Sequence, residues 1–222
     1  MSQRNKIDAV IPAKGRSTRC ANKNIRPFAP DKSSLLALQI EKLHRLEFIN
    51  DVYVSTDDDE ISNLVMECGG KVVKRSPHLC SDDASMNEVY KHLATLSQTD
   101  DLLYASVTTP FIRLDSYYEA FEKYSANDNR CVHTTSIIKD FLVLDGKPIN
   151  FDKEQFPRSQ DLPPIQKIVY GFSIIRKEEL YSTSSSLGRA FLPQLLASPE
   201  DFDIDDESEF QMAKVLWEQS CG

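Results

Sequence analysis

Glycine and cysteine are sparse in this sequence, and their placement excludes several common kinds of site. The seven glycines form neither a Walker A loop nor a GxGxxG fingerprint. The five cysteines are scattered without CxxC spacing, which argues against a zinc site or a disulfide framework and indicates reduced thiols. The four histidines show no metal-ligand spacing, and no cysteine pairs with a histidine in a nucleophile signature.

Long apolar runs and an excess of positive charge are also missing. No apolar stretch approaches the ~18 residues of a spanning helix, and the stretch near the N-terminus is too short for a secretory signal. The 222-residue chain has a formal net charge of -8, which argues against nucleic-acid and anionic-membrane binding. We therefore expect a cytoplasmic protein that folds as one domain, residues 1–222, with a substantial core.

Strand-like and helix-like segments alternate through the first 138 residues. Strands are predicted at 7–13, 51–56, 71–74, 102–107 and 131–138, and helices at 35–46, 57–68, 81–96 and 115–124. This alternation predicts an α/β three-layer sandwich with a mostly parallel, Rossmann-like sheet. Because such sheets bind ligands outside the carboxyl ends of their strands, the basic loop after residue 13 should meet the polar segments 55–58 and 106–110.

The pattern changes between residues 139 and 164. Proline and glycine interrupt any long element there, and polar residues dominate the second half of the segment. We interpret it as an excursion from the domain, an arm or a lid. A strand at 166–176 and a helix at 207–218 then return to the sheet.

The first loop concentrates positive charge in an acidic protein. Residues 11–28 contain no acid and five cations: Lys14, Arg16, Arg19, Lys23 and Arg26. Backbone N–H groups and cationic side chains behind the first strand of such a sheet are suited to bind a polyphosphate. The alternative is a solvated basic loop.

Asp203 and Asp205 form a DxD pair before the last helix. In an extended chain, residues two apart point the same way, so both carboxylates can reach one ion. Hard oxygen ligands next to a polyphosphate suit Mg²⁺. The alternative is an acidic cap on the final helix, where negative charge is favourable.

Two further segments have a functional and a structural interpretation. The sequence SDDAS at 81–85 is typical of a helix N-cap with acids in the first turn. Arg158, in the excursion, could hold a substrate carboxylate through a bidentate pair, or could be an ordinary surface arginine.

Together these motifs resemble those of the CMP–sialic acid synthetases, the acylneuraminate cytidylyltransferases. The matching motifs are IPAKGRS from Ile11, KNI from Lys23, VSTDD from Val54, SDDAS from Ser81, TTP from Thr108, SQDLP from Ser159 and DID from Asp203. They occur in the family's order and span roughly residues 6–218, which makes the combination more specific than any single motif.

The resemblance implies a reaction. CTP reacts with a 3-deoxy-2-keto sugar acid, whose anomeric hydroxyl attacks the α-phosphate to give a CMP-sugar and pyrophosphate. It also implies Mg²⁺ as cofactor and a homodimer in which the excursion, residues 139–164, reaches the partner. The cations of the first loop would then face the CTP phosphates.

The resemblance also assigns roles by position. Lys23, Lys14 and Arg19 match catalytic cations; Ala13, Gly15, Asn24, Asp82 and Ser85 match nucleotide-binding positions; Arg158, Gln160 and Ser106 match acceptor-binding positions; Asp203 and Asp205 match the Mg²⁺ ligands.

Several positions depart from the family pattern. Lys14 stands where arginine is usual, Arg16 where a small residue is common, Thr18 where a lysine is frequent and Ser106 where a glutamine is expected. These departures leave two alternatives open. The chain could transfer CMP to a non-sialic acceptor, or it could be a catalytically inactive nucleotide-binding homologue.

Overall fold

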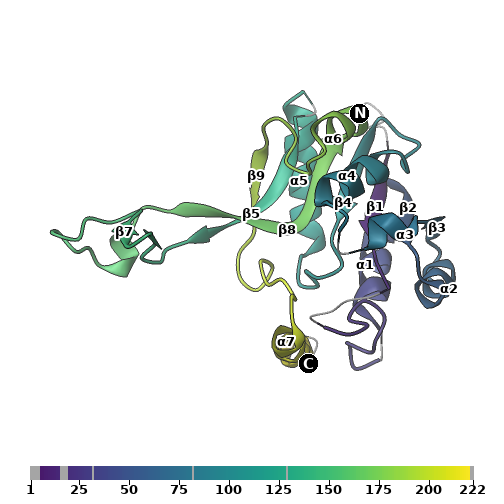
Figure 1. Ribbon diagram of the computed structural model, residues 1–222, viewed down its shortest axis with the longest axis horizontal. Helices are drawn as coiled ribbons and strands as arrows, with labels where there is room; N and C mark the ends of the chain where they lie inside the picture. The colour runs from purple at the N-terminus through teal and green to yellow at the C-terminus, as the bar shows by residue number, and fades with distance from the viewer. Residues whose placement is uncertain (1–5, 16–19, 32, 82, 129, 221–222) are drawn as a thin grey trace.

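The computed structural model describes residues 6–15, 20–31, 33–81, 83–128 and 130–220. Its centre is a seven-stranded sheet with the order β3-β2-β1-β4-β8-β5-β9. The strands are β1 (Ile7–Pro12), β2 (Ile49–Thr56), β3 (Lys71–Lys74), β4 (Asp101–Ala105), β5 (Val132–Ile138), β8 (Ile165–Arg176) and β9 (Leu192–Leu195). Helices lie on both sides of the sheet (Figure 1), which confirms the predicted α/β sandwich.

The sheet is mostly parallel, with one reversed strand. β1 pairs in parallel with β2 and β4, β2 with β3, and β5 with β9. β8 is antiparallel to both of its neighbours, β4 and β5. The carboxyl ends of β1, β2 and β4 therefore share one edge, as the sequence predicts.

α1 (Leu35–His44) and α2 (Asp59–Glu67) begin where a short polar side chain accepts a hydrogen bond from a backbone N–H of the first helical turn. Ser34 caps α1 by accepting a hydrogen bond from the N–H of Ala37. Asp58 caps α2 in the same way through the N–H of Ile61, at 2.9 Å. Gly69 follows α2 with a φ of +79°, a left-handed conformation that glycine adopts without a steric penalty.

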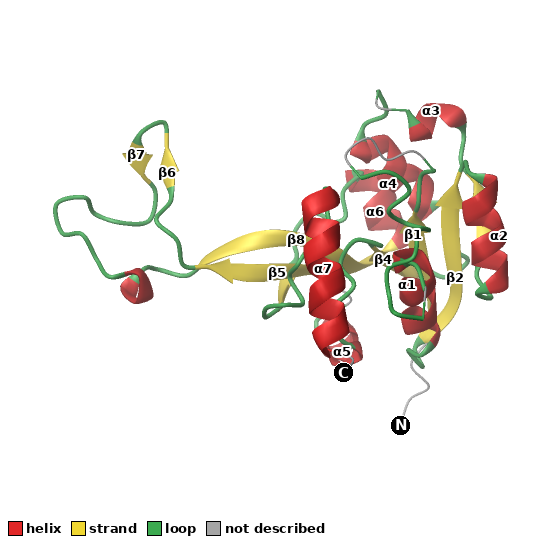
Figure 2. Ribbon diagram, turned by 90° about the horizontal axis from the view of Figure 1, so that it is seen from below, coloured by secondary structure: helices red, strands yellow, loops and turns green. Residues whose placement is uncertain are grey.

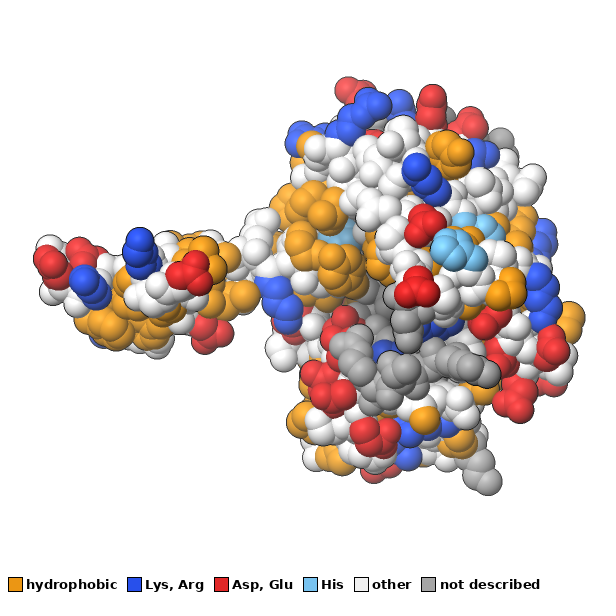
Figure 3. Space-filling model, viewed as in Figure 1, with side chains coloured by type: hydrophobic (Ala, Val, Ile, Leu, Met, Phe, Trp, Pro, Cys, Tyr) orange, Lys and Arg blue, Asp and Glu red, His pale blue; other side chains and the backbone are white. Residues whose placement is uncertain are grey.

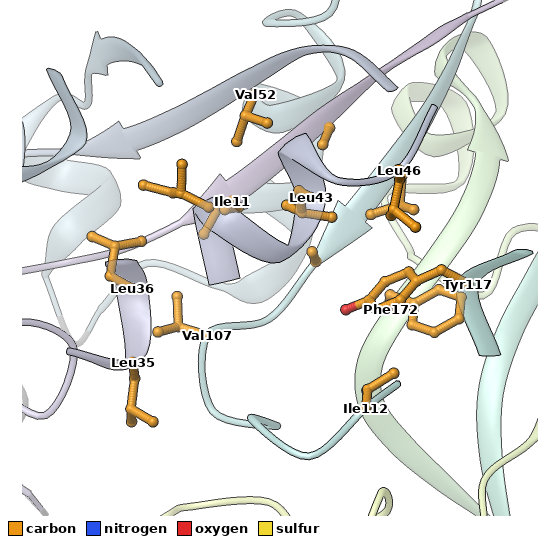
Figure 4. Packing of buried hydrophobic residues seen from close by; sticks show 14 of the residues in the cluster. Ile11, Leu35, Leu36, Leu43, Leu46, Val52, Val107, Ile112, Tyr117 and Phe172 are labelled. Carbon is orange, nitrogen blue, oxygen red and sulfur yellow. The ribbon is translucent and has the colours of Figure 1, made fainter. Parts of the chain in front are cut away.

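Alternating side chains of the strands supply two hydrophobic cores. In β4, Leu103 points into the core with α1, α2, α5 (Leu114–Ala126) and α7 (Glu207–Ser220), whereas Leu102 points into the core with α4 (Met86–Ala94) and α6 (Lys177–Thr183). Figure 4 shows the larger core; its labelled residues are Ile11, Leu35, Leu36, Leu43, Leu46, Val52, Val107, Ile112, Tyr117 and Phe172.

An arm projects from the body of the molecule (Figures 1 and 2). It continues the β5–β8 ladder, whose last pair is Ile138 with Ile165, and it contains the segment between those residues. Its elements are the short hairpin of β6 (Val143–Leu144) and β7 (Lys147–Pro148) and the 3₁₀ turn η1 (Ser159–Asp161). The excursion predicted from proline and glycine at 139–164 corresponds to this arm.

Candidate functional site

The loop after β1 is held against the end of β2 by its own backbone. The N–H of Ala13 donates to the carbonyl of Ser55 at 2.9 Å, and the N–H of Gly15 donates to Oδ1 of Asp57 at 3.1 Å. Burial alone would raise the pKa of Asp57, but hydrogen bonds led by the one from Gly15 hold it below its usual range. Ala13 is fully buried, backbone included, and its N–H is already bonded to Ser55, so this residue shapes the loop.

Glycine is required at position 15 by the closeness of the neighbouring loop. A Cβ on Gly15 would lie 2.7 Å from the Cβ of Asp58 and 2.9 Å from its Cγ. A larger residue would push the loop away from β2. Arg16 and Arg19, which belong to the same loop, lie outside the described residues.

Lys23 and Asn24 connect this loop to two other segments. Nδ2 of Asn24 donates to the carbonyl of Lys14 at 3.3 Å, which ties the two halves of the basic loop together. Nζ of Lys23 donates to the carbonyl of Ile204 at 2.7 Å. The lysine therefore reaches the residue that lies between Asp203 and Asp205.

We call residues 201–206 the acidic strap. Oγ1 of Thr108 donates to Oδ1 of Asp203 at 2.5 Å, and the N–H of Ile204 donates to the carbonyl of Thr108 at 3.0 Å. The hydroxyl of Ser106 lies 2.9 Å from that of Thr108. The strap is thus fixed to the segment that follows β4, the third polar segment expected at this edge.

Burial sets the electrostatics of the strap. It raises the pKa of Asp203, against the hydrogen bond from Thr108 and the charge of Lys23, while the neighbouring Asp205 adds to the rise. A partly buried carboxylate next to a second carboxylate favours a bound cation, because the cation offsets both desolvation and repulsion.

The cap of α7 is made by residues other than the DxD pair. Oδ1 of Asp206 accepts from the N–H of Glu209 at 3.0 Å and from the Ser208 hydroxyl at 2.7 Å. In return, Oε2 of Glu209 accepts from the N–H groups of Asp205 and Asp206, at 2.6 and 3.1 Å. This is a capping box. The N-cap carboxylate of α7 is therefore Asp206 rather than Asp203 or Asp205.

The donor set of the strap suits a cation that completes its shell with phosphate or water. In the described part of the chain, no three His, Cys, Asp or Glu side chains form a group able to hold a metal. Mg²⁺ commonly binds to one or two carboxylates together with substrate phosphates. Asp203 and Asp205 fit that arrangement but not an all-protein metal site.

Arg26 differs from the other cations of the loop. Its Nη2 pairs with Oε2 of Glu207 at 2.7 Å, and its guanidinium lies 3.7 Å from the centroid of the Phe210 ring. Both partners belong to α7. Arg26 therefore holds the basic loop against the last helix. The prediction that it faces the CTP phosphates is wrong, because its guanidinium is engaged by α7.

Ser85 lies at the start of α4, as its N-cap. The N–H of Glu88 donates to the Ser85 hydroxyl at 3.3 Å, and the N–H of Ser85 donates to Oε2 of Glu88 at 2.9 Å. The motif therefore does cap a helix, but the predicted start at residue 81 is wrong: α4 begins at Met86, so Asp83 precedes the cap instead of lying in the first turn. The motif's second predicted residue, Asp82, lies outside the described residues.

Arg158 and Gln160 lie on the arm, away from the strap. Nε and Nη2 of Arg158 pair with Asp161 at 2.7 and 3.2 Å. Figures 1 and 2 show the arm extending away from the edge formed by β1, β2 and β4. A single chain therefore brings together Lys14, Gly15, Lys23, Asn24, Ser106, Asp203 and Asp205 but not Arg158 or Gln160.

A buried arginine next to this region was missed by the sequence analysis. Arg75 follows β3, and its Nη2 donates to the carbonyl of Ser55 at 2.7 Å, while its buried Nε has no hydrogen-bond partner among the described atoms. Nε2 of His92 lies 2.8 Å from the hydroxyl of Ser55, and burial lowers the pKa of His92. The sequence did contain a signal for Arg75: it is a cation directly after the predicted strand 71–74, which ends at the same edge of the sheet.

The arm exposes apolar side chains. The rings of Phe141 and Phe156 stack at 4.7 Å, and Phe151 packs edge-on against Phe141 at 5.1 Å. Phe156 nevertheless keeps 66% of its surface exposed, and Leu144 keeps 64%. Hydrophobic side chains gather along the arm and around its base (Figure 3). Such contiguous apolar surface is typical of a protein interface.

Comparisons with known proteins agree with this architecture. The family model for cytidylyltransferase matches residues 9–190. Among solved structures, a CMP:2-keto-3-deoxy-manno-octonic acid synthetase complexed with CTP is similar in fold, with a TM-score of 0.74 and 16% identity, over 97% of this chain and 100% of that one.

Curated relatives match over nearly the whole chain. A pseudaminic acid cytidylyltransferase of Campylobacter jejuni is 26% identical over 94% of this chain and 94% of its own length. An N-acylneuraminate cytidylyltransferase of Escherichia coli is 27% identical over 96% of this chain, which spans 52% of that longer protein. Within the described residues, no helix has the length and apolar character needed to cross a bilayer.

The family model covers most of the chain, and the fold, the order of the motifs and the named relatives agree with it. The protein belongs to the cytidylyltransferase family and is a CTP-dependent nucleotidyltransferase.

Proposed function

We propose that this chain transfers CMP from CTP to a 3-deoxy-2-keto sugar acid and releases pyrophosphate. The observation that carries the proposal is the hydrogen bond from Lys23 Nζ to the carbonyl of Ile204, at 2.7 Å. It places a cation of the basic loop beside the two carboxylates of the strap. A nucleotidyl transfer from a triphosphate needs both features next to each other.

The basic loop binds the triphosphate in this proposal. Lys14 and Lys23 contact its phosphate oxygens, while Ala13 and Gly15 hold the loop against the end of β2, where the missing side chain of Gly15 leaves room for Asp58. Arg19 is assigned to the same role as a prediction from sequence. Asn24 holds the loop in shape through its hydrogen bond to the carbonyl of Lys14.

Asp203 and Asp205 hold Mg²⁺ in this proposal. When bound, the ion neutralises charge on the phosphate oxygens and makes pyrophosphate a better leaving group. Thr108 orients Asp203 through its hydroxyl, and Lys23 fixes the backbone between the two aspartates.

The chemical step is a substitution at the α-phosphorus. The anomeric hydroxyl oxygen of the sugar acid forms a bond to that phosphorus and releases its proton to water, while the bond from the same phosphorus to the pyrophosphate oxygen breaks. The cations of the loop offset the charge that develops on the leaving group.

The acceptor assignment draws on the relatives and on the placement of polar side chains. The curated relatives are named for pseudaminic acid and N-acylneuraminate. Ser106 lies next to Thr108 and thus close to the strap. Arg158 and Gln160 would complete the acceptor site from a second copy of the chain, because the arm that carries them extends away from its own site.

Pyrophosphate release tests the proposal. The protein is mixed with Mg²⁺ and each of CTP, UTP, ATP and GTP, against sialic acid, its deaminated analogue, legionaminic acid, pseudaminic acid and Kdo. We expect release with CTP and one of these acids, and none when the acid is omitted.

Two other outcomes lead to the alternatives. Release with CTP and an acceptor outside the sugar acids would retain the nucleotide site and replace the acceptor. CTP binding without release for any acceptor would identify a nucleotide-binding homologue that has lost the reaction.

A further inference from the structure

A second cavity lies outside the site described above, and its lining contains none of the residues assigned to nucleotide, acceptor or metal. It has a volume of about 870 Å³ and lies between α1, the 110–115 segment, the 197–200 segment and Trp217 of α7. That volume falls in the range of small-molecule sites, roughly 300–1,000 Å³.

The walls of this cavity are apolar and aromatic. Leu38, Phe111 and Trp217 contribute to them, together with two prolines and further aliphatic residues. The rings of Phe111 and Trp217 lie 5.9 Å apart, and the ring of Phe28 supports Trp217 from another side at 5.5 Å. Aromatic walls that are fixed in this way bind flat or extended apolar groups with little loss of side-chain entropy.

Three cations line this cavity, and Lys42 is the least exposed of them. Its Nζ donates to the carbonyl of Pro110 at 2.7 Å, which uses one of the three N–H groups of an ammonium. Burial lowers the pKa of Lys42 to about 8, and the charge of Arg45 adds to the lowering, whereas Glu200 opposes it. A bound anion would stabilise the charged form of this amine and would accept hydrogen bonds from its two other N–H groups.

Glu200, the carboxylate whose charge acts on Lys42, forms its hydrogen bonds with other residues. Glu200 is buried and accepts hydrogen bonds from the N–H of Arg113 at 2.9 Å, from Nη2 of Arg113 at 3.2 Å and from the Ser116 hydroxyl at 2.6 Å. The other charged residues that line the cavity are Glu41, Arg45 and Asp115.

We propose that this cavity binds a small amphipathic carboxylate, whose apolar body packs against the adjoining rings of Phe111 and Trp217 and whose carboxylate accepts hydrogen bonds from Lys42. A charge-assisted hydrogen bond to the half-buried Lys42 side chain is stronger than its fully exposed equivalent. Burial of the apolar body adds about 25 cal/mol per Å² of surface removed from water.

The position of the cavity connects it to the strap. Pro110 lies two residues after Thr108, which bonds to Asp203, and Phe111 packs edge-on against Phe202 of the strap at 6.1 Å. A ligand in the cavity therefore contacts the segment that supports the strap, although its binding requires neither CTP nor turnover.

The single tryptophan of the chain provides the measurement. Trp217 fluorescence is followed while 4-phenylbutyrate is added to the full-length protein without nucleotide. The matched probes are 4-phenylbutanol, which has the same apolar body without the charge, and acetate, which has the charge without the body. We expect a saturable change with phenylbutyrate and binding at least about tenfold weaker for the other two.

The dependence on pH separates Lys42 from other cations. Phenylbutyrate is ionised at pH 7 and pH 9, whereas Lys42 passes from mostly protonated to mostly neutral. We expect its Kd to rise about tenfold from pH 7 to pH 9, while the Kd of phenylbutanol stays unchanged. Equal affinity for acid and alcohol, or an acid Kd that does not change with pH, would overturn the proposal without any variant.

Substitutions give the second test, with thermal melting to confirm folding. Lys42→Gln keeps a donor for the Pro110 carbonyl but has no charge, so it should lower acid affinity at pH 7 to that of the alcohol. Lys42→Arg should keep acid binding and lose its pH dependence. Lys91→Gln, on the exposed side of α4, is the control and should behave as wild type. If Lys42→Gln bound phenylbutyrate as tightly as wild type, Lys42 would not be the residue that binds the carboxylate.

Discussion

Lys23 connects the two charged features of the site, and its removal tests the basic loop directly. Lys23→Ala deletes a cation from the phosphate region, and loss of one such donor typically reduces kcat by roughly 10²–10³-fold. We expect a loss of that size in pyrophosphate release, with the melting temperature retained to within a few degrees. Lys91→Ala is the matched surface control. A Lys23→Ala enzyme with most of its kcat would refute the phosphate assignment.

Asp205 tests the strap, and its neighbour provides the control. Asp205→Asn keeps the shape of the side chain but removes one hard anionic ligand. We expect the Mg²⁺ concentration for half-maximal rate to rise about tenfold or more. Asp206→Asn is the matched control: its Oδ1 still accepts the cap hydrogen bond of α7, so both the melting temperature and the Mg²⁺ titration should stay unchanged. Identical titrations for Asp205→Asn and wild type would exclude this carboxylate as a ligand.

His133 makes stability depend on pH. It is fully buried, and burial lowers its pKa to about 4 from an ordinary value near 6.5. The unfolded chain therefore binds the extra proton between these values, so the stability that His133 contributes is complete above pH 6.5 and is lost as pH falls toward 4.

The size of this effect is about 2 kcal/mol between pH 7 and pH 5. Urea unfolding of wild type and His133→Phe at both pH values measures it, because the variant keeps a planar ring but cannot titrate. We expect the variant to lose about 2 kcal/mol less than wild type on acidification. An equal loss in both proteins would show that His133 is readily protonated in the fold.

The partners of individual charges could not be predicted from sequence. Arg26 and Lys23 occur in the same loop, yet one pairs with Glu207 and the other reaches Ile204, in each case 181 positions along the chain. Arg158 pairs locally with Asp161, which its spacing permits but does not require. Residue types and spacing indicated the chemistry of the region, whereas the tertiary fold decided which side chains take part.

At the level of elements, the cap of α4 provides a local test of whether Ser85 has a second role. Ser85→Ala removes the acceptor for the N–H of Glu88 and should cost about 1 kcal/mol of stability, measured by urea unfolding. If Ser85 also contacts cytidine, the KM for CTP should rise in Ser85→Ala. It should rise in Ser85→Asn as well, although that variant keeps the cap. An unchanged KM in both variants would leave the serine with the capping role alone.

Elements with local signals were predicted well, and those set by packing were not. The predicted helices at 35–46 and 57–68 agree with α1 and α2 to within about two residues, because the caps Ser34 and Asp58 and the left-handed Gly69 depend only on nearby residues. The antiparallel direction of β8 has no local signal. α3 (Pro77–Cys80), α6 and β9 were not predicted, since α3 is a single turn, α6 follows β8 without a loop and β9 is short and contains a proline.

At the level of the whole molecule, the exposed phenylalanines of the arm predict a second copy of the chain as partner. Burial of surfaces such as those of Phe156 and Leu144 would stabilise a symmetric dimer. Phe156→Ser together with Leu144→Ser should shift the sedimentation coefficient to that of a monomer, while the circular dichroism of the sheet is retained. A variant that sediments as wild type would assign the arm another role.

A mixing experiment tests whether each site needs two chains. Lys23→Ala and Arg158→Ala are each expected to be inactive alone. When the two are unfolded together and refolded, half of the dimers contain both chains, and each of these holds one intact site if Arg158 serves the partner. We expect recovery of about a quarter of wild-type activity. No recovery would place Arg158 outside the partner's site.

The central claim is that the basic loop and the strap direct attack at the α-phosphorus of CTP. Phosphorus NMR of CTP, Mg²⁺, a sugar acid and the protein tests this most directly, because it identifies the products of the phosphate chain. The account predicts equal amounts of a CMP-sugar phosphodiester and pyrophosphate, both absent with Lys23→Ala. The appearance of CDP with a phosphorylated sugar, or of CTP unchanged with every acid that binds, would contradict it.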